Sequence, residues 1–417
     1  MIDTPPLPLW PLLAAALGLL ALLGTGLLVA RPRTSPAAGM LALIALLITL
    51  VGYAATGFAL HFGGVGILID HPDALTLVWE WTPLQHGDLA LWGVAGWAGF
   101  GMADAQTPLA ALLFVTALPL AATATLLAMQ TLWRQLSPGA GLCFAALTAL
   151  LLAPLAGNWT QAGGWLMHLG QSIGAGAGYR DFGGASFFLL PGGVALAAVL
   201  AFRSARWEDK TAASGVNAAL GASLLAAGGV GWIIASPLHL WGGSSPVQAV
   251  LNGLLALAAG GLIGLAYGWF VAGEPEIGWI ARSAAAGWIA SLAALPWLTP
   301  LQALLTGAVA AWIFILAAWI IDELLGWRDP GAVLATFGLP AAWGLMAVGF
   351  FAPARGQFRA QAIGVVSIAL LAFFTTSVFL GIIGLFGKVW GRRGRQDEES
   401  GVDDAGSAPA PSNALAE

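Results

Sequence analysis

Charged side chains are scarce in this sequence, and their scarcity decides the class of protein before any motif is considered. Lys, Arg, Asp and Glu make up 8% of the 417 residues, while 59% of the residues are hydrophobic. Soluble globular domains carry roughly 25% charged residues. The composition therefore excludes an ordinary soluble protein. It predicts a multi-pass membrane protein, in which each crossing needs about twenty apolar residues.

Cysteine and the common catalytic motifs are also nearly absent. The single thiol, Cys143, lies in an apolar run, so an internal disulfide and a thiolate metal cluster are excluded. No Gly-rich phosphate loop follows a strand, no His and Glu residues have metal-ligand spacing, and no nucleophile has a base nearby. We therefore expect no enzyme, no cofactor and no metal site. The net charge of -5 gives no basis for binding nucleic acid.

Long hydrophobic runs are what the sequence has in abundance. Eleven of them are bounded by charges or by Gly and Pro: 8–30, 39–62, 108–132, 138–156, 182–202, 213–236, 247–271, 279–295, 299–321, 331–352 and 360–387. An external amino terminus puts twelve of the 15 Lys and Arg residues on the cytoplasmic side, as the positive-inside rule requires. The predicted fold is all-α, with eleven transmembrane helices in the cell (inner) membrane and a cytoplasmic carboxyl terminus.

The chain divides into one membrane domain, residues 1–390, and a tail, residues 391–417. The tail is basic, then acidic, and rich in Pro, Ala and Ser. Such a segment cannot bury a core, so we expect it to be disordered and cytoplasmic. The longest break between the runs, 62–107, is expected to form an external cap or vestibule. An interfacial or re-entrant helix is predicted within it, over residues 89–102.

The fifth run begins with the sequence DFGGASFFLLPGG, from Asp181 to Gly193. A plain lipid-facing helix requires neither its Gly pairs nor its Pro, and small residues let helices approach closely. Gly183 and Gly184 are therefore predicted to be structural. Asp181 either caps free backbone N–H groups or attracts a cation at the outer mouth. A second Gly/Pro-interrupted stretch, 337–345, lies in the tenth run, so we predict an inverted five-plus-five repeat with the eleventh helix packed outside.

The order of these segments resembles the ammonium transporter/Rh family from about residue 8 to residue 388. Five stretches carry the likeness: FALHFG at 58–63, GGWL at 163–166, DFGG at 181–184, GW at 231–232 and FGLPAAWG at 337–344. The resemblance implies a homotrimer with one pore in each protomer. It also implies a small-molecule substrate, ammonium or ammonia.

This chain departs from the family at the centre of the pore. Family members usually place two histidines there, and the matching positions hold Leu189 and Pro340. Two imidazoles can pass a proton and hydrogen-bond a neutral amine, whereas Leu and Pro side chains can do neither. A bare ammonium ion in a low-dielectric tube carries a cost that reaches tens of kcal/mol. We therefore expect electrogenic ammonium transport to be lost. Pro340 has a second interpretation, a helix kink between packed neighbours.

The remaining candidates come from the same resemblance. The further pore-lining candidates are Phe114, Trp232, Ala235 and Ser236. The outer-vestibule candidates are Trp159, Gln161 and His239, where Gln161, or Trp159 in a shifted frame, takes the place of the family's outer Trp. Trp232 either lines the pore or packs in the core, and His239 either contacts the solute or is an ordinary interfacial histidine.

The sequence thus predicts a membrane transporter or channel that conducts ammonium, ammonia or another small neutral molecule without the usual histidine relay. The alternative is a non-conducting paralogue that serves sensing or assembly with true transporters. The tail is short and carries no recognisable family motif, which argues against a PII-type regulator and weakens that alternative.

Overall fold

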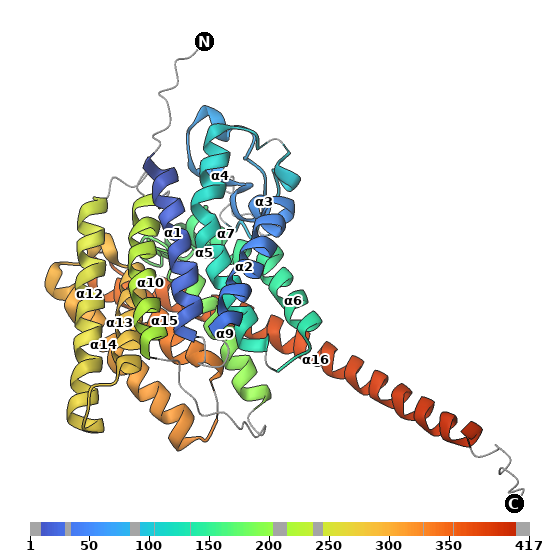
Figure 1. Ribbon diagram of the computed structural model, residues 1–417. Coiled ribbons are helices and arrows are strands. Elements are labelled where there is room, and N and C mark those ends of the chain that lie inside the picture. The colour runs from blue at the N-terminus through green and yellow to red at the C-terminus, as the bar shows by residue number, and fades with distance from the viewer. Residues whose placement is uncertain are drawn as a thin grey trace, which may run out of the picture.

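The computed structural model describes residues 10–29, 35–83, 92–103, 105–133, 135–202, 215–236, 245–327, 329–352 and 354–405. Its helices stand side by side in a bundle, and one small β-hairpin lies at an end of that bundle (Figure 1). The predicted all-α membrane architecture is confirmed.

Within the described ranges, nine helical segments are long and apolar enough to cross a membrane. They are Trp10–Val29, Gly39–Leu68, Pro108–Trp133, Pro138–Gln161, Gly215–Ala235, Pro246–Val271, Pro300–Leu324, Leu334–Phe351 and Gln357–Leu385. Two more helices, α9 (Ser186–Ala201) and α13 (Ile277–Leu292), have 16 residues each. Each of the eleven predicted runs overlaps one of these segments. The count of eleven crossings stays a prediction, because α9 and α13 are shorter than a full span.

Several spans are assembled from more than one helical piece. Besides α9 and α13, the α-helices of the described residues are α1 (Trp10–Val29), α2 (Ser35–Gly52), α3 (Phe58–Phe62), α4 (Val65–Leu68), α5 (Pro108–Trp133), α6 (Pro138–Leu147), α7 (Ala153–Gln161), α8 (Leu169–Ile173), α10 (Gly215–Ala235), α12 (Pro246–Tyr267), α14 (Pro300–Trp319), α15 (Leu339–Phe351) and α16 (Gln357–Ala405). π-Helical turns join or end them at Tyr53–Gly57, Thr148–Leu152, Gly268–Ala272, Ile320–Leu324 and Leu334–Gly338. Short 3₁₀ turns lie at Pro72–Ala74, Phe100–Met102, Leu295–Trp297 and Pro330–Ala332.

Small residues explain how the helices approach each other so closely. Helices α1 and α10 meet along a row of glycines, where a Cβ at Gly228 would lie 2.2 Å from the backbone nitrogen of Ala21. A Cβ at Gly24 would lie 2.4 Å from the backbone nitrogen of Leu225. In a bilayer, where lipid is as apolar as the helix surface, such close contact drives association. The abundance of glycine is therefore a packing feature of the bundle.

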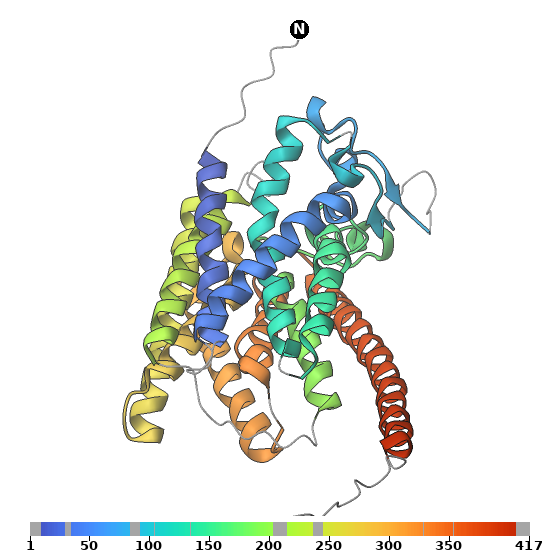
Figure 2. The ribbon, with the colours of Figure 1, turned by 45° about the vertical axis from the view of Figure 1, so that its right-hand side comes forward.

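The cap is a hairpin, and the helix predicted over residues 89–102 is wrong for the part that is described, 92–102. Strand β1 (Glu80–Trp81) pairs antiparallel with β2 (Ala95–Gly96), and the cap lies at the end of the bundle where α1 begins (Figure 2). Gly99 and Gly101 take φ values of 88° and 63°, which a helix does not allow. Apolar composition suggested a helix here, but glycine conformation and strand pairing decided the structure.

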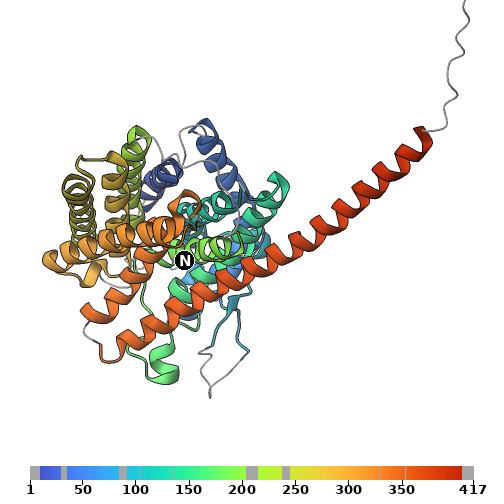
Figure 3. The ribbon, with the colours of Figure 1, turned by 90° about the horizontal axis from the view of Figure 1, so that it is seen from below.

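Helix α16 runs across the bundle and its carboxyl-terminal part projects away from it (Figure 3). The helix continues to Ala405, so the structure differs from the disorder predicted over residues 391–405. Extending an existing helix needs no new nucleus, which explains why a polar segment continues it. Residues 406–417 lie outside the described residues, and the division of the chain at residue 390 stays a prediction.

The fifth and tenth runs have matching features. They cross at Gly192 and Gly338, where a Cβ on Gly192 would lie 2.4 Å from the Cα of Gly338. Each run follows an aspartate: Asp329 accepts hydrogen bonds from two backbone N–H groups of the tenth run at 3.0 and 2.7 Å, and Asp181 caps the fifth. This pairing is what the inverted repeat predicts.

Candidate solute pocket beneath the cap

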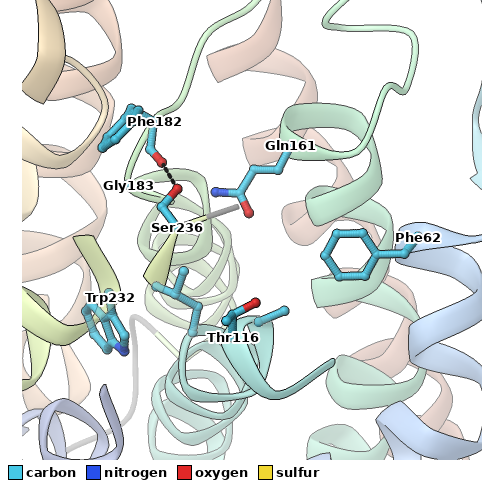
Figure 4. A pocket seen from close by; sticks show the side chains of 9 residues that line it. Phe62, Thr116, Gln161, Phe182, Gly183, Trp232 and Ser236 are labelled. Atoms are coloured by element: carbon cyan, nitrogen blue, oxygen red, sulfur yellow. Dashed lines mark hydrogen bonds between the residues drawn. The ribbon is translucent and has the colours of Figure 1, made fainter. Parts of the chain in front are cut away.

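A narrow pocket lies in the bundle on the side of the cap (Figure 4). Its walls come from the end of α3, the middle of α5, the end of α7, the segment before α9 and the end of α10. The residues that line it are Phe62, Thr116, Ala117, Leu120, Gln161, Phe182, Gly183, Trp232 and Ser236. The pocket has room for about one water-sized molecule.

Three polar side chains reach this pocket. Ser236 donates its hydroxyl proton to the carbonyl oxygen of Phe182 at 3.2 Å, and Thr116 donates to the carbonyl of Leu113 at 3.2 Å. Each hydroxyl thus spends its only proton on the backbone, so toward a bound molecule its oxygen is an acceptor. The amide of Gln161 projects into the space between them (Figure 4) and offers both a donor and an acceptor.

The rest of the pocket wall is apolar or aromatic. Trp232 and Phe62 stand on opposite sides of the pocket (Figure 4). No charged side chain is among the described residues that line it. The aromatic faces favour a cation weakly, but an ion without a counter-charge keeps most of its desolvation cost. The pocket therefore suits a small polar molecule that accepts few and donates several hydrogen bonds.

Asp181 and the following glycines shape the wall before α9. The carboxylate of Asp181, which is 1% exposed, accepts backbone N–H hydrogen bonds from Gly184, Ala185 and Ser186 at 3.1, 2.8 and 2.7 Å. Gly184 has a φ of 81°, which favours glycine, and a Cβ at Gly183 would lie 2.9 Å from a backbone oxygen of α13. Capping and close approach together fix the turn that contributes to the pocket wall.

Aromatic rings pack against Trp232, which lines the pocket. The ring of Phe188 lies 5.6 Å from that of Trp232 and is stacked on Phe337 at 6.1 Å, with an interplanar angle of 10°. Leu189 and Pro340 are buried next to these rings in the chain, and neither lines the described pocket. The side chains next to the pocket in this part of the bundle are therefore apolar.

The predicted pore-lining residues separate into two groups. Trp232 and Ser236 line the pocket, while Phe114 and Ala235 do not. The ring of Phe114 instead packs against that of Tyr53, with centroids 5.3 Å apart. The aromatic wall that Phe114 was expected to supply comes from Phe62.

The outer-vestibule candidates also differ in position. Gln161 lines the pocket. Trp159 supports the cap, because its indole N–H donates to the carbonyl oxygen of Val94 at 2.7 Å. His239 lies outside the described residues. Gln161, not Trp159, therefore occupies the place next to the solute pocket.

Five lining residues were not predicted: Phe62, Thr116, Ala117, Leu120 and Phe182. Thr116 and Leu120 are four residues apart, so they share one face of α5. The sequence does not single out that face, because the same helix also carries Thr123, Thr125 and Thr131. Phe182 directly follows the capping aspartate, and Phe62 belongs to the FALHFG stretch already singled out.

A carboxyl group lies between the cap and the helices of the pocket. Glu80 of β1 accepts a hydrogen bond from the Nδ2 of Asn158, on α7, at 3.2 Å. A Cβ at Gly93 would lie 1.9 Å from the Glu80 carboxyl carbon, so glycine makes room for that group. Burial raises the pKa of Glu80 to about 7, and the hydrogen bond from Asn158 opposes the shift.

Comparison with known sequences gives one family for nearly the whole chain. The model of the Ammonium Transporter Family matches residues 9–408. A putative ammonium transporter of Synechocystis is 27% identical over 343 residues, which cover 78% of this chain and 74% of the relative. The ammonium transporter Amt2 of Archaeoglobus fulgidus is 26% identical over 272 residues, 62% of this chain and 58% of the relative.

Solved structures with the same fold agree with the sequence match. A protein described as a sensor Amt protein superimposes with a TM-score of 0.72 at 21% identity, over 90% of this chain and 92% of that one. Mep2 of Candida albicans superimposes with a TM-score of 0.69 at 21% identity, over 89% and 82%. At these identities the likeness concerns the fold.

Proposed function

The chain belongs to the ammonium transporter family, and we propose that it conducts ammonia, or another small neutral molecule of that size, through a pore in each protomer. The pore begins at the pocket beneath the cap. Transport proceeds without a histidine relay and moves no net charge. The protein is a multi-pass membrane protein and not an enzyme in this proposal.

The pocket itself is the observation that carries the proposal. It admits about one water-sized molecule, and Gln161, Thr116 and Ser236 bring polar atoms to it. Ammonia has the size of water, donates three hydrogen bonds and accepts one. The two hydroxyl oxygens and the Gln161 amide oxygen supply acceptors for those donors.

The neutral form of the solute is favoured by what lies beyond the pocket. Phe188, Phe337 and Trp232 pack together there, and no histidine stands at positions 189 or 340. An ammonium ion that entered this region would lose its hydration with no counter-charge and no proton acceptor to replace it. A neutral molecule needs only transient space between side chains, so the free-energy barrier to its crossing is much lower.

Orientation and assembly form part of the same proposal. The amino terminus lies outside, the carboxyl terminus lies in the cytoplasm, and the cap faces the exterior of the cell (inner) membrane. The distribution of Lys and Arg supports this orientation. The protein forms a homotrimer with one pore per protomer, as the resemblance to the family implies, and needs neither a cofactor nor a PII-type regulator.

The alternative function is a non-conducting member that binds its solute for sensing or assembly. The stacked rings of Phe188 and Phe337 favour it, because aromatic side chains packed behind Trp232 would oppose the passage of a solute. One structural relative is described as a sensor. In this reading the pocket would bind ammonium or ammonia without release to the cytoplasm.

Filling the pocket distinguishes these functions. Ala117→Val adds two methyl groups to a lining position, so the ammonia permeability of proteoliposomes should fall at least about tenfold. The matched control is Ala219→Val on the exposed face of α10, which should conduct like the wild type. The permeability is measured by stopped-flow with a pH-sensitive dye inside the vesicles. Wild-type vesicles no more permeable than empty ones, together with solute binding by titration calorimetry, would favour the non-conducting alternative.

A further inference from the structure

Gly18 of α1 lies against the edge of Trp232, although α1 contributes no described residue to the pocket wall. A Cβ at Gly18 would lie 2.7 Å from the Cδ1 and 3.0 Å from the Nε1 of Trp232, and 3.2 Å from the Cβ of Pro119. Carbon atoms in contact lie roughly 3.5–4.0 Å apart. The indole of Trp232 therefore occupies the space that a side chain at position 18 would need.

Helices α1 and α10 are packed too tightly to move apart and make that space. Next to Gly18, a Cβ at Gly231 would lie 2.8 Å from the backbone nitrogen of Gly18 and 2.4 Å from the carbonyl oxygen of Ala14. One turn earlier on α10, a Cβ at Gly228 would lie 2.2 Å from the backbone nitrogen of Ala21. Moving α1 away would break this row of close backbone contacts, which holds the two helices together. A side chain at position 18 therefore displaces the indole and not the helix.

Packing alone holds the indole of Trp232 in place. The residue is 3% exposed, and its Nε1 has no hydrogen-bond partner among the described residues. The ring also packs against that of Phe188, which is itself buried, at a centroid distance of 5.6 Å. The described free space next to the indole is the pocket, which Trp232 lines. An indole displaced from α1 thus moves into the pocket, because the packed side chains around it leave little other room.

We propose that Gly18 is a positioning residue that sets the width of the pocket through Trp232 and thereby limits the solute to the size of ammonia. This inference rests on the proposed function. The pocket has room for about one water-sized molecule, so a shift of the indole by about 1 Å, which restores carbon–carbon contact distance to an added Cβ, is enough to close it. Methylamine carries a methyl group that this space does not hold. The solute class is therefore an amine without a carbon substituent.

A double-mutant cycle between positions 18 and 232, in the full-length protein in lipid vesicles, separates this role from a merely structural one. Gly18→Ala should lower the ammonia permeability at least about tenfold, because the added methyl group moves the indole into the pocket. Trp232→Leu replaces the rigid ring by a shorter, more flexible side chain. On that background, Gly18→Ala should change the permeability less than about twofold. Gly39→Ala on α2 is the matched control and should conduct like the wild type, because a Cβ there meets nothing within 4 Å.

The selectivity of Trp232→Leu tests the size limit separately. The ratio of methylamine to ammonia permeability should be at least about tenfold higher in this variant than in the wild type, because the pocket widens where the indole was. An unchanged ratio would overturn the size limit. A Gly18→Ala effect of equal size with Trp232 and with Leu at position 232 would overturn the coupling, and so would a loss of folded Gly18→Ala protein that Trp232→Leu does not restore.

A spectroscopic readout follows the indole itself and does not depend on conduction. In protein labelled with fluorotryptophan, the ¹⁹F signal that is missing in Trp232→Leu belongs to Trp232. This signal should shift in Gly18→Ala and stay in place in Gly39→Ala. An unshifted signal in Gly18→Ala would refute the proposal. A shifted signal, together with wild-type vesicles no more permeable to ammonia than empty ones, would leave the positioning by Gly18 standing and refute the proposed function.

Discussion

Asp181 caps the turn that contributes Phe182 and Gly183 to the pocket wall. Three backbone N–H groups donate to its carboxylate at 2.7 to 3.1 Å, in a place with almost no exposed surface. Free N–H groups at a helix start need such acceptors, and charge-assisted hydrogen bonds are the strong ones. The Asp181 side chain thus stabilises the fold by capping the free N–H groups at the start of α9.

Replacing this carboxylate tests the capping role. Asp181→Ala should lower the free energy of unfolding by about 2 to 4 kcal/mol, because three buried N–H groups lose their acceptor. Asp181→Asn, which keeps one acceptor oxygen, should lose less. Melting in detergent, followed by intrinsic fluorescence, gives the comparison, with Asp70→Ala at an exposed position as the control. Unchanged yield and melting of Asp181→Ala would contradict a structural role.

At the residue level, the candidates that the family resemblance supplied separate into two groups. Gln161 and Ser236 are polar residues at the ends of apolar runs, and both line the pocket. Phe114 and Ala235 were chosen from the same family resemblance and do not line the pocket. An offset of one or two positions turns a helix residue through 100° or more. At low sequence similarity, a family resemblance therefore locates a membrane span more reliably than the face of the helix that lines a pocket.

At the scale of elements, the hairpin β1–β2 covers the pocket and carries a titratable group against the bundle. Glu80 sits between the hairpin and Asn158, and burial raises its pKa from 4.5 to about 7. The folded protein then binds this proton more tightly than the unfolded chain does. The contribution of protonated Glu80 to the stability of the folded protein is fully present below about pH 4.5. It is lost as the pH rises through about 7, the pKa of Glu80 in the folded protein.

Glu80→Gln should remove this pH dependence, since an amide does not ionise. Relative to the variant, the wild type should lose thermal stability between about pH 5 and about pH 8, and the two should converge at the acid end. The hydrogen bond from Asn158 can be kept by the amide oxygen of Gln. Melting temperatures across this range provide the measurement, and Glu274→Gln at an exposed site is the control. Parallel pH profiles for Glu80→Gln and wild type would refute the effect.

The hairpin also shows where element prediction fails. Nine of the eleven predicted runs overlap described helical segments that are long and apolar enough to cross a membrane, because about twenty apolar residues have few other structures available. The cap between residues 62 and 107 is held by contacts distant in sequence, such as the Trp165 N–H to the carbonyl of Gly93 at 2.8 Å. No local pattern encodes such contacts. The positive φ of Gly99 and Gly101 has no signal beyond the presence of glycine itself.

For the whole molecule, the fold of the family is kept. The family match covers residues 9–408, and the capping aspartates and the Gly192–Gly338 crossing keep the two halves in place. Leu189 and Pro340 lie close in the sequence to the stacked rings of Phe188 and Phe337, and their correspondence to the family's pore histidines stays a prediction. Fold and membrane class follow from composition and run length. Conduction depends on side-chain packing at the centre, which composition does not specify.

The central claim is that this protein passes a neutral molecule and no charge. Solid-supported membrane electrophysiology on proteoliposomes, with ammonia flux recorded on the same vesicles, measures charge and solute together. The account predicts an ammonia flux above that of empty vesicles with no ammonium-evoked current. A measurable current that saturates with ammonium concentration would contradict it.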